Sequence, residues 1–183
     1  ILFPEEYGGY GGNFLDLAVV LHETGYACPP GAFFASAVMG GLTILEAGSE
    51  EKKRELLPGM VSGERIITLA WTETSGRYSP DLISARAELQ GDSYILDGTK
   101  LFVPYAHVAD TLIVSARTAS GQSGSEDGLS LFLVDAKSNG LSSQVLKTLA
   151  GDKQCEVGLN RVRVPKENLL GKLNQGGADD VPF

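Results

Sequence analysis

The sequence predicts an α+β protein in which an N-terminal helical segment precedes a small antiparallel β-barrel or sandwich. Three observations indicate this fold. Apolar residues recur at the helical spacing of three and four positions before about residue 64. After that point they mostly alternate with polar residues, as half-buried strands require. A chain of 183 residues with 43% hydrophobic content is also long enough to bury a substantial core.

The first helix is predicted from residue 14 to about residue 24. Its apolar positions follow one helical face: Phe14, Leu17, Ala18 and Leu21. Asn13 can cap its start, and Asp16 lies favourably in the first turn. Gly25 and the Pro29-Pro30-Gly31 segment are expected to end it.

Two further helices are predicted before the spacing of apolar residues changes from helical to alternating. An apolar helix covers residues 32–47. The next begins at Ser49, whose hydroxyl can cap it, with Glu50 and Glu51 near the positive end of the helix dipole. Pro58 and Gly59 are expected to interrupt this third helix.

Six or seven short strands are predicted in the second part, without helices between them. Alternation in residues 83–89 is typical of a half-buried strand, and Gly91-Asp92 supplies a turn after it. Asp97-Gly98 predicts a hairpin between residues 94–96 and 100–103, because both turn positions tolerate positive φ. The remaining strands are expected at residues 111–117, 129–135, 142–149 and 156–164, the last closed by Pro165.

Composition argues against several function classes. A formal net charge of −8 disfavours nucleic acid, and no apolar run is long enough to cross a bilayer, so we expect a soluble protein. Cys28, Cys155, His22 and His107 are too far apart in sequence to suggest a metal site. Two unpaired thiols without a secretion signal predict a reducing, cytoplasmic location. The Gly/Ser-rich residues 121–128 are interpreted as a mobile hairpin loop.

A series of motifs resembles the acyl-CoA dehydrogenase family, in the family's order along nearly the whole chain. In the first part these motifs are Pro4-Glu5-Glu6-Tyr7-Gly8-Gly9, Gly48-Ser49-Glu50-Glu51-Lys52-Lys53, Leu57-Pro58 and Ser62-Gly63-Glu64. In the second part they are Thr72-Glu73, Asp97-Gly98-Thr99-Lys100, Ala109-Asp110, Leu131-Phe132-Leu133-Val134, and Val162-Arg163-Val164-Pro165 with Leu169-Leu170-Gly171. No motif is specific alone, so the resemblance depends on their order and spacing.

The resemblance implies a domain order and a chemistry. Residues 1–63 would be part of an N-terminal helical domain, residues 64–171 a middle β domain, and residues 172–183 the start of a linker to a C-terminal helical domain. Family members bind FAD and desaturate an acyl-CoA thioester: a carboxylate removes the α proton as the β hydride moves to the flavin. That carboxylate belongs to the C-terminal domain, so no catalytic residue is expected in this chain. The complete protein would act in fatty acid metabolism as a homo- or hetero-oligomer.

By position, the resemblance places seven residues beside the cofactor: Leu69, Trp71, Thr72, Gly76, Tyr78, Phe102 and Pro104. Thr72 would donate its hydroxyl to the pyrimidine side of the isoalloxazine, with Leu69 and Trp71 in backbone or packing contacts. Strand propensity alone is the other explanation for a threonine here. Glu73 is interpreted as a carboxylate that accepts hydrogen bonds from nearby backbone groups, and not as the catalytic base.

Two departures from the family pattern leave three functional alternatives open. Arg77 and Tyr78 are large where the family's turn approaches phosphate groups, so they would clash or Arg77 would pair with a phosphate. Phe102-Val103-Pro104 stands where the family commonly has Trp-Ile-Thr, and Pro104 offers the flavin neither an N–H nor a hydroxyl. The alternatives are a catalytic acyl-CoA dehydrogenase, a structural subunit with weak flavin binding, and a flavin oxidase or monooxygenase of the same fold.

Overall fold

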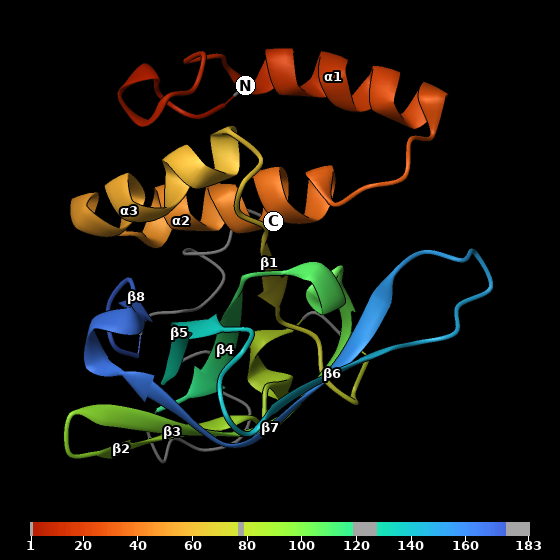
Figure 1. Ribbon diagram of the computed structural model, residues 1–183. Coiled ribbons are helices and arrows are strands. Elements are labelled where there is room, and N and C mark those ends of the chain that lie inside the picture. The colour runs from red at the N-terminus through yellow and green to blue at the C-terminus, as the bar shows by residue number, and fades with distance from the viewer. Residues whose placement is uncertain (1, 77–78, 119–127, 175–183) are drawn as a thin grey trace.

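The computed structural model describes residues 2–76, 79–118 and 128–174, and it has the predicted α+β architecture. A helical layer formed by the first third of the chain lies over one end of a curved β-sheet (Figure 1). The helical elements are η1 (Glu5–Tyr7), α1 (Phe14–Ala27), η2 (Phe34–Gly40), α2 (Gly41–Ala47) and α3 (Glu50–Val61). The predicted order of helices before strands is therefore confirmed.

Local sequence signals explain how α1 begins and ends. The Asn13 side chain accepts hydrogen bonds from the backbone of Leu15 and Asp16, and Asp16 accepts one from the Asn13 N–H, which completes a capping box. The helix continues past Gly25, where we expected it to end, and ends at Ala27. Cys28 then adopts a left-handed conformation as the C-cap, directly before Pro29.

The predicted helix at residues 32–47 is formed by η2, which has π-helical hydrogen bonding, and by α2, which follows without a break. Glycines at the junction allow close contact with neighbouring segments. A Cβ atom on Gly40 would lie 2.4 Å from the Ile67 carbonyl oxygen, and one on Gly41 would lie 2.3 Å from the Phe3 ring. The Ser36 hydroxyl also accepts a hydrogen bond from the Ile67 N–H at 3.2 Å.

The prediction that Pro58 and Gly59 interrupt the third helix is wrong, because α3 continues to Val61. Proline removes one intrahelical donor, but this loss is outweighed by packing on either side of it. Leu57 is fully buried and Met60 nearly so, and both belong to the core beneath the helical layer. The predicted cap is confirmed, since the Ser49 hydroxyl accepts a hydrogen bond from the Lys52 N–H.

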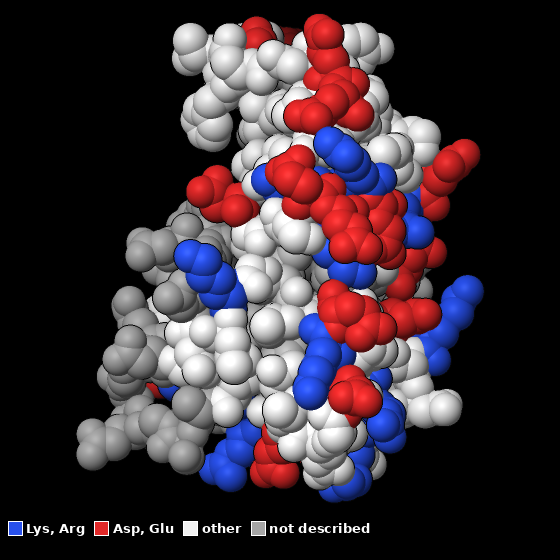
Figure 2. Space-filling model, turned by 90° about the vertical axis from the view of Figure 1, so that its left-hand side faces the viewer, with Lys and Arg blue, Asp and Glu red and all other residues white. Residues whose placement is uncertain are grey.

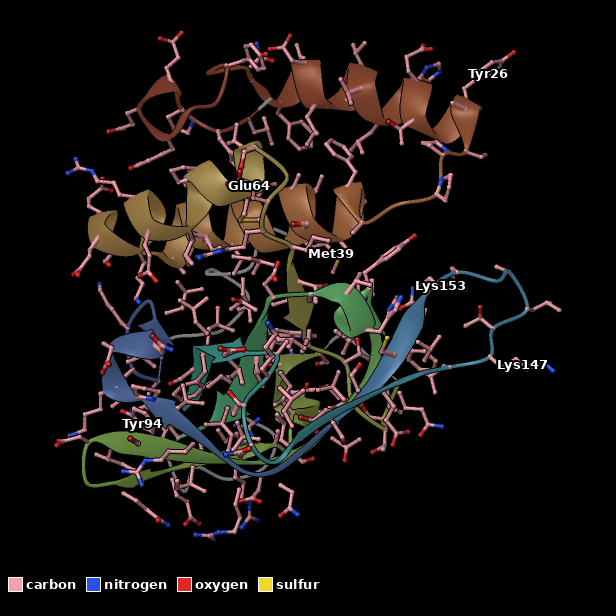
Figure 3. The ribbon with its side chains drawn as sticks, in the orientation of Figure 1. Tyr26, Met39, Glu64, Tyr94, Lys147 and Lys153 are labelled. Carbon is pink, nitrogen blue, oxygen red and sulfur yellow. The ribbon has the colours of Figure 1, made fainter. Side chains whose placement is uncertain are left out.

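Within the described residues, eight strands form the sheet, in the order β6-β7-β3-β2-β4-β5-β8, with β1 beside β4. Their bounds are β1 (Ile67–Ala70), β2 (Arg86–Gln90), β3 (Ser93–Pro104), β4 (Thr111–Arg117), β5 (Leu129–Asp135), β6 (Leu141–Val145), β7 (Gln154–Pro165) and β8 (Leu169–Leu170). Most pairs are antiparallel as expected, but β1 and β2 each pair with β4 in parallel. Strand β6 ends earlier than predicted, and the segment between β6 and β7 projects outward between Lys147 and Lys153 (Figure 3).

The predicted hairpin at Asp97-Gly98 is wrong, because β3 runs through both residues. The turn that joins β2 and β3 is instead Gly91-Asp92. The register against β7 shifts between Leu96 and Gly98, which is a β-bulge. Gly98 lies so close to Ala85 that an added Cβ would stand 2.6 Å from the Ala85 Cβ. The glycine is therefore required for close packing and not for a turn.

Two apolar cores lie on opposite faces of the central strands. Alternate residues of β4 and β5 face each core, so both strands are almost entirely buried and read as continuous apolar runs. One core is enclosed by the curved sheet, where Tyr94 of β3 contacts Phe132 of β5 at a ring distance of 5.0 Å. The other lies between the sheet and the helical layer. β1 contributes to this second core through Ile67 and Leu69.

The structure also bears on the cysteines, on possible metal ligands and on the length of the helices. Both cysteines are free thiols, as predicted; the structure places Cys28 at the surface and Cys155 in the interior. Within the described ranges, no group of three or more potential metal ligands comes together, and no helix is both long and apolar enough to cross a bilayer. Most of the loop predicted at residues 121–128 lies outside the described residues.

Candidate functional site

The structure brings together the two segments that the sequence singled out, residues 69–73 and 97–103. The Leu101 N–H donates a hydrogen bond of 2.8 Å to the Thr72 carbonyl oxygen. Further along the same contact, the Thr68 hydroxyl donates a bond of 2.7 Å to the Pro104 carbonyl oxygen. β1 and its extension therefore lie directly against the second half of β3. Thr72 therefore lies beside Leu101, which directly precedes Phe102, whereas Pro104 lies beside Thr68, four residues before Thr72.

A second irregularity of β3 turns Phe102 out of the sheet. The register against β7 shifts between Lys100 and Val103, and Phe102 has a φ of 54°. Its side chain is 50% exposed, while Val103 beside it is buried. A left-handed conformation is costly for a bulky residue and persists only where the surrounding structure imposes it. The bulge therefore presents an aromatic ring to the outside at the end of this strand.

The other predicted site residues have different environments. Leu69 and Trp71 are buried in the core beneath the helical layer. Thr72 is also largely buried. Gly76 has a φ of 66° and its N–H donates to the Glu73 carbonyl oxygen, which closes a tight turn. Tyr78 lies outside the described residues, as does Arg77.

Beneath these strand ends lies a buried ion pair between Glu73 and Lys100. The Lys100 Nζ is 2.8 Å from Glu73 Oε1, and the Lys100 and Glu73 side chains are 0% and 4% exposed. The same ammonium donates to the Ser115 hydroxyl at 2.9 Å and to the Trp71 carbonyl oxygen at 3.3 Å. All three of its protons therefore have acceptors, which is the condition for a charge to be tolerated in a core.

Glu73 is held as the sequence predicted, by neighbouring backbone groups. Its carboxylate accepts hydrogen bonds from the Ser84 N–H at 2.8 Å and from the Ala85 N–H at 3.0 Å. The Ser84 hydroxyl adds a third bond, so together with Lys100 four donors surround the carboxylate. Such a carboxylate is a poor candidate for a catalytic base, because proton uptake would break several of these bonds.

Electrostatics favour the charged form of both groups at neutral pH. Burial raises the pKa of Glu73, but the Lys100 ammonium and the bonds from Ser84 and Ala85 outweigh burial, so this pKa lies below its usual value. Burial lowers the pKa of Lys100 to about 8, against the opposing effect of Glu73. Both side chains are therefore ionised at pH 7, and the pair carries no net charge.

Sequence reasoning missed the role of the Lys100 side chain, although a signal was present. Tyr94 and Leu96 of β3 point into the core, and Lys100 has the same parity along the strand. A lysine at an inward position requires an acidic partner, and Glu73 is the buried acidic residue among the described ones. The Ser115 acceptor, at a buried position of β4, gave no comparable signal.

A charged pocket of about 410 Å³ lies elsewhere, between α3 and the adjoining ends of β4 and β5. Its lining includes Lys52, Glu55, Arg65, Asp110 and Lys137. Figure 2 shows acidic and basic side chains next to one another on one face of the molecule. Exposed pairs of this kind, such as Lys52 with Glu55 at 2.8 Å, contribute little to stability.

Comparison with known proteins places the whole chain in one family. The family description "Acyl-CoA dehydrogenase, N-terminal domain" matches residues 1–64, and "Acyl-CoA dehydrogenase, middle domain" matches residues 68–162. The probable acyl-CoA dehydrogenase YngJ of Bacillus subtilis is 33% identical over 181 residues, which are 96% of this chain and 47% of that protein.

Two solved structures are also similar. The prolyl acyl carrier protein oxidase AnaB has a TM-score of 0.86 and 27% identity, over 97% of this chain and 48% of that one. The ChsE4-ChsE5 complex from Mycobacterium tuberculosis has a TM-score of 0.84 and 26% identity, over 96% and 45%. The chain thus spans about half the length of the proteins it matches. On the combined family matches, identity and fold, the chain belongs to the acyl-CoA dehydrogenase family.

Proposed function

We propose that this chain forms one wall of the FAD site of an acyl-CoA dehydrogenase, which desaturates an acyl-CoA thioester between its α and β carbons. The observation that carries the proposal is the junction of Thr72 with Leu101, which brings the Thr72 hydroxyl and the exposed Phe102 ring to neighbouring strand ends. When bound, FAD would supply the acceptor for the substrate's β hydride.

The residues at this junction fit a flavin in three respects. Phe102 offers an exposed ring, held outward by a strained backbone, for packing against the isoalloxazine. Thr72 offers a hydroxyl donor for the pyrimidine side, while Leu69 and Trp71 support it from the core. Gly76 closes a tight turn with the Glu73 carbonyl oxygen, and a Cβ atom added there would meet nothing within 4 Å; by its position in the sequence, Tyr78 is assigned to the same site. Glu73 is already engaged, so the base that removes the α proton would come from another part of the complete protein.

One observation favours a second candidate, a structural subunit with weak flavin binding. Pro104 has no N–H, and its carbonyl oxygen is already bonded to Thr68, so it has no donor to offer a flavin. The ChsE4-ChsE5 structure shows that a protein of this fold occurs in a complex of two named components. A homo- or hetero-oligomer is accordingly part of both proposals.

A third candidate is a flavin oxidase or monooxygenase of the same fold, and the similarity to AnaB, an oxidase, favours it. For the preferred dehydrogenase, an acyl-CoA substrate implies a role in fatty acid metabolism. The two free thiols are consistent with a cytoplasmic location.

The test is a visible absorption spectrum of the full-length protein, purified without added cofactor, followed by anaerobic titration with a panel of acyl-CoA thioesters. We expect flavin bands that one class of thioester bleaches. Absence of flavin even after FAD addition would favour the structural subunit. Flavin that is reduced only by substrates without CoA, or that reacts rapidly with oxygen once reduced, would favour the third candidate.

The Thr72→Val variant tests the assignment of this residue. We expect FAD to bind about fivefold more weakly, since a net hydrogen bond contributes about 1 kcal/mol. Thr43→Val is the matched control, because Thr43 is also buried but its hydroxyl bonds to Met39 within the helical layer. Equal FAD affinity in both variants and the parent would make Thr72 a packing residue only.

A further inference from the structure

We propose that Lys100 is a positioning residue for the flavin-facing strand ends, because its buried side chain fixes the backbone that carries Thr72. This inference rests on the proposed flavin site and adds a residue whose side chain is not itself exposed to a ligand. Lys100 acts through Thr72 and is not proposed to contact the reacting atoms.

The central observation is that consecutive residues of β3 hold consecutive carbonyl groups of the β1 extension. The Lys100 Nζ donates to the Trp71 carbonyl oxygen at 3.3 Å, and the Leu101 N–H donates to the Thr72 carbonyl oxygen at 2.8 Å. The carbonyl groups before and after the Thr72 α carbon are thus both held by β3. With both peptide planes restrained, the direction of the Thr72 side chain is restrained as well.

The remaining contacts of Lys100 hold its ammonium in one place. Glu73 Oε1 lies 2.8 Å away and belongs to the same extension as Thr72, while the Ser115 hydroxyl lies 2.9 Å away on β4. The lysine therefore links β3, β4 and the extension of β1 at one point. A charge so close to the Trp71 carbonyl also polarises the peptide that joins Trp71 to Thr72.

Stability alone is a weak explanation for this arrangement. Burying two charges costs several kcal/mol per ion, and apolar residues of similar size are often as stable or more stable. The other inward residues along the regular part of β3, such as Tyr94 and Leu96, are aromatic or aliphatic. The costly charged pair occurs toward the end of β3, near the point where Phe102 turns outward. This location supports a role in fixing the site geometry.

The experiment compares Lys100→Met with a control in the full-length protein. Val164→Ala is the control, because Val164 is buried on β7 and pairs with Tyr94, about 20 Å along β3 from residue 100. We expect Lys100→Met to weaken FAD binding tenfold or more and to alter the shape of the flavin absorption band. Val164→Ala should leave both unchanged within twofold, even where it lowers the melting temperature as much.

A pH profile separates positioning from general support of the fold. Three groups face the ammonium: the Glu73 carboxylate, the Ser115 hydroxyl and the Trp71 carbonyl. Because burial lowers the pKa of Lys100 to about 8, the ammonium becomes an amine between pH 7 and 9. As the pH rises from 7 to 9, the ratio of the parent's FAD affinity to that of Lys100→Met should fall threefold or more.

If Lys100→Met does not fold, the double variant Lys100→Met/Glu73→Gln removes both charges together and serves in its place. The inference is overturned if these variants bind FAD like the parent, or if their loss of affinity merely matches that of Val164→Ala at equal melting temperature. Failure of the proposed function gives a different result, since the parent itself would then show no flavin reduction by any acyl-CoA thioester.

Discussion

Replacing Glu73 by glutamine tests how strongly the buried pair stabilises the middle of the fold. The change keeps the size of the side chain but removes its charge and exchanges one acceptor oxygen for a donor amide. In the parent, both carboxylate oxygens are engaged: Oε2 by the N–H and hydroxyl of Ser84, and Oε1 by Ala85 and Lys100. Whichever way the amide turns, at least one donor that cannot reverse its role opposes it: the Ser84 N–H on one side, or the Ala85 N–H and the Lys100 ammonium on the other.

The expected loss of stability follows from the charge that remains. Lys100 would stay buried without its carboxylate, and breaking a buried pair from one side costs about 3–5 kcal/mol. Because the largest part of this cost is the unpaired lysine, Lys100→Met in the same background should recover more than half of the loss. The two substitutions should therefore be strongly non-additive.

Hydrogen–deuterium exchange of the full-length protein measures this loss locally. Amides of β1 and β3 should exchange about a hundredfold to several thousandfold faster in Glu73→Gln than in the parent, since 1.4 kcal/mol corresponds to a factor of ten. α1, whose contacts lie elsewhere, should exchange as before. The reasoning is refuted if Lys100→Met and Glu73→Gln have additive effects, or if β1 and β3 keep the protection of the parent.

Three further predictions concern neighbouring features. The pKa of Lys100 is about 8 in the folded state and near 10.5 in the unfolded state, so the unfolded state binds more protons between pH 8 and 10.5. The free energy of unfolding, relative to that of Lys100→Met, should therefore rise from pH 8 to 10 by on the order of 1 kcal/mol per pH unit. Gly98→Ala should cost about 1–3 kcal/mol by denaturant titration because of its clash with Ala85, and Ala85→Gly should relieve part of it; an unaffected midpoint would contradict the packing. Pro104→Thr supplies a hydroxyl, and unchanged flavin reduction kinetics and retention would argue against its place beside the cofactor.

The elements that the sequence predicted best are those with strong local signals. Asn13 and Ser49 cap α1 and α3, as predicted from their side chains. The apolar runs at residues 111–117 and 129–135 form β4 and β5 with the predicted bounds. The approach of residues 69–73 to residues 97–103 was anticipated from the family resemblance, because neither segment carries a local signal for the other.

The errors arose where tertiary packing overrides local preference. Asp97-Gly98 has the composition of a hairpin turn, but Gly98 is needed for its contact with Ala85. Pro58 lacks a donor that a helix uses, but the buried Leu57 holds α3 together across it. Two acceptors of Lys100, on Trp71 and Glu73, belong to the extension of β1, but the third, Ser115, belongs to β4, so no short stretch of sequence contains all three together with the lysine.

The glycine junction between η2 and α2 has a consequence for building chimaeric proteins. Gly40 approaches the backbone of β1, and Ser36 bonds to Ile67 three residues after the predicted domain boundary. A helical segment transplanted from a relative would meet β1 on arrival, and any side chain larger than hydrogen at position 40 would collide with it. Exchange of residues 1–63 would therefore succeed only with donor sequences that carry glycine at the position of Gly40. Similarity in sequence is not sufficient for such an exchange, because the helical segment must also fit against the backbone of β1.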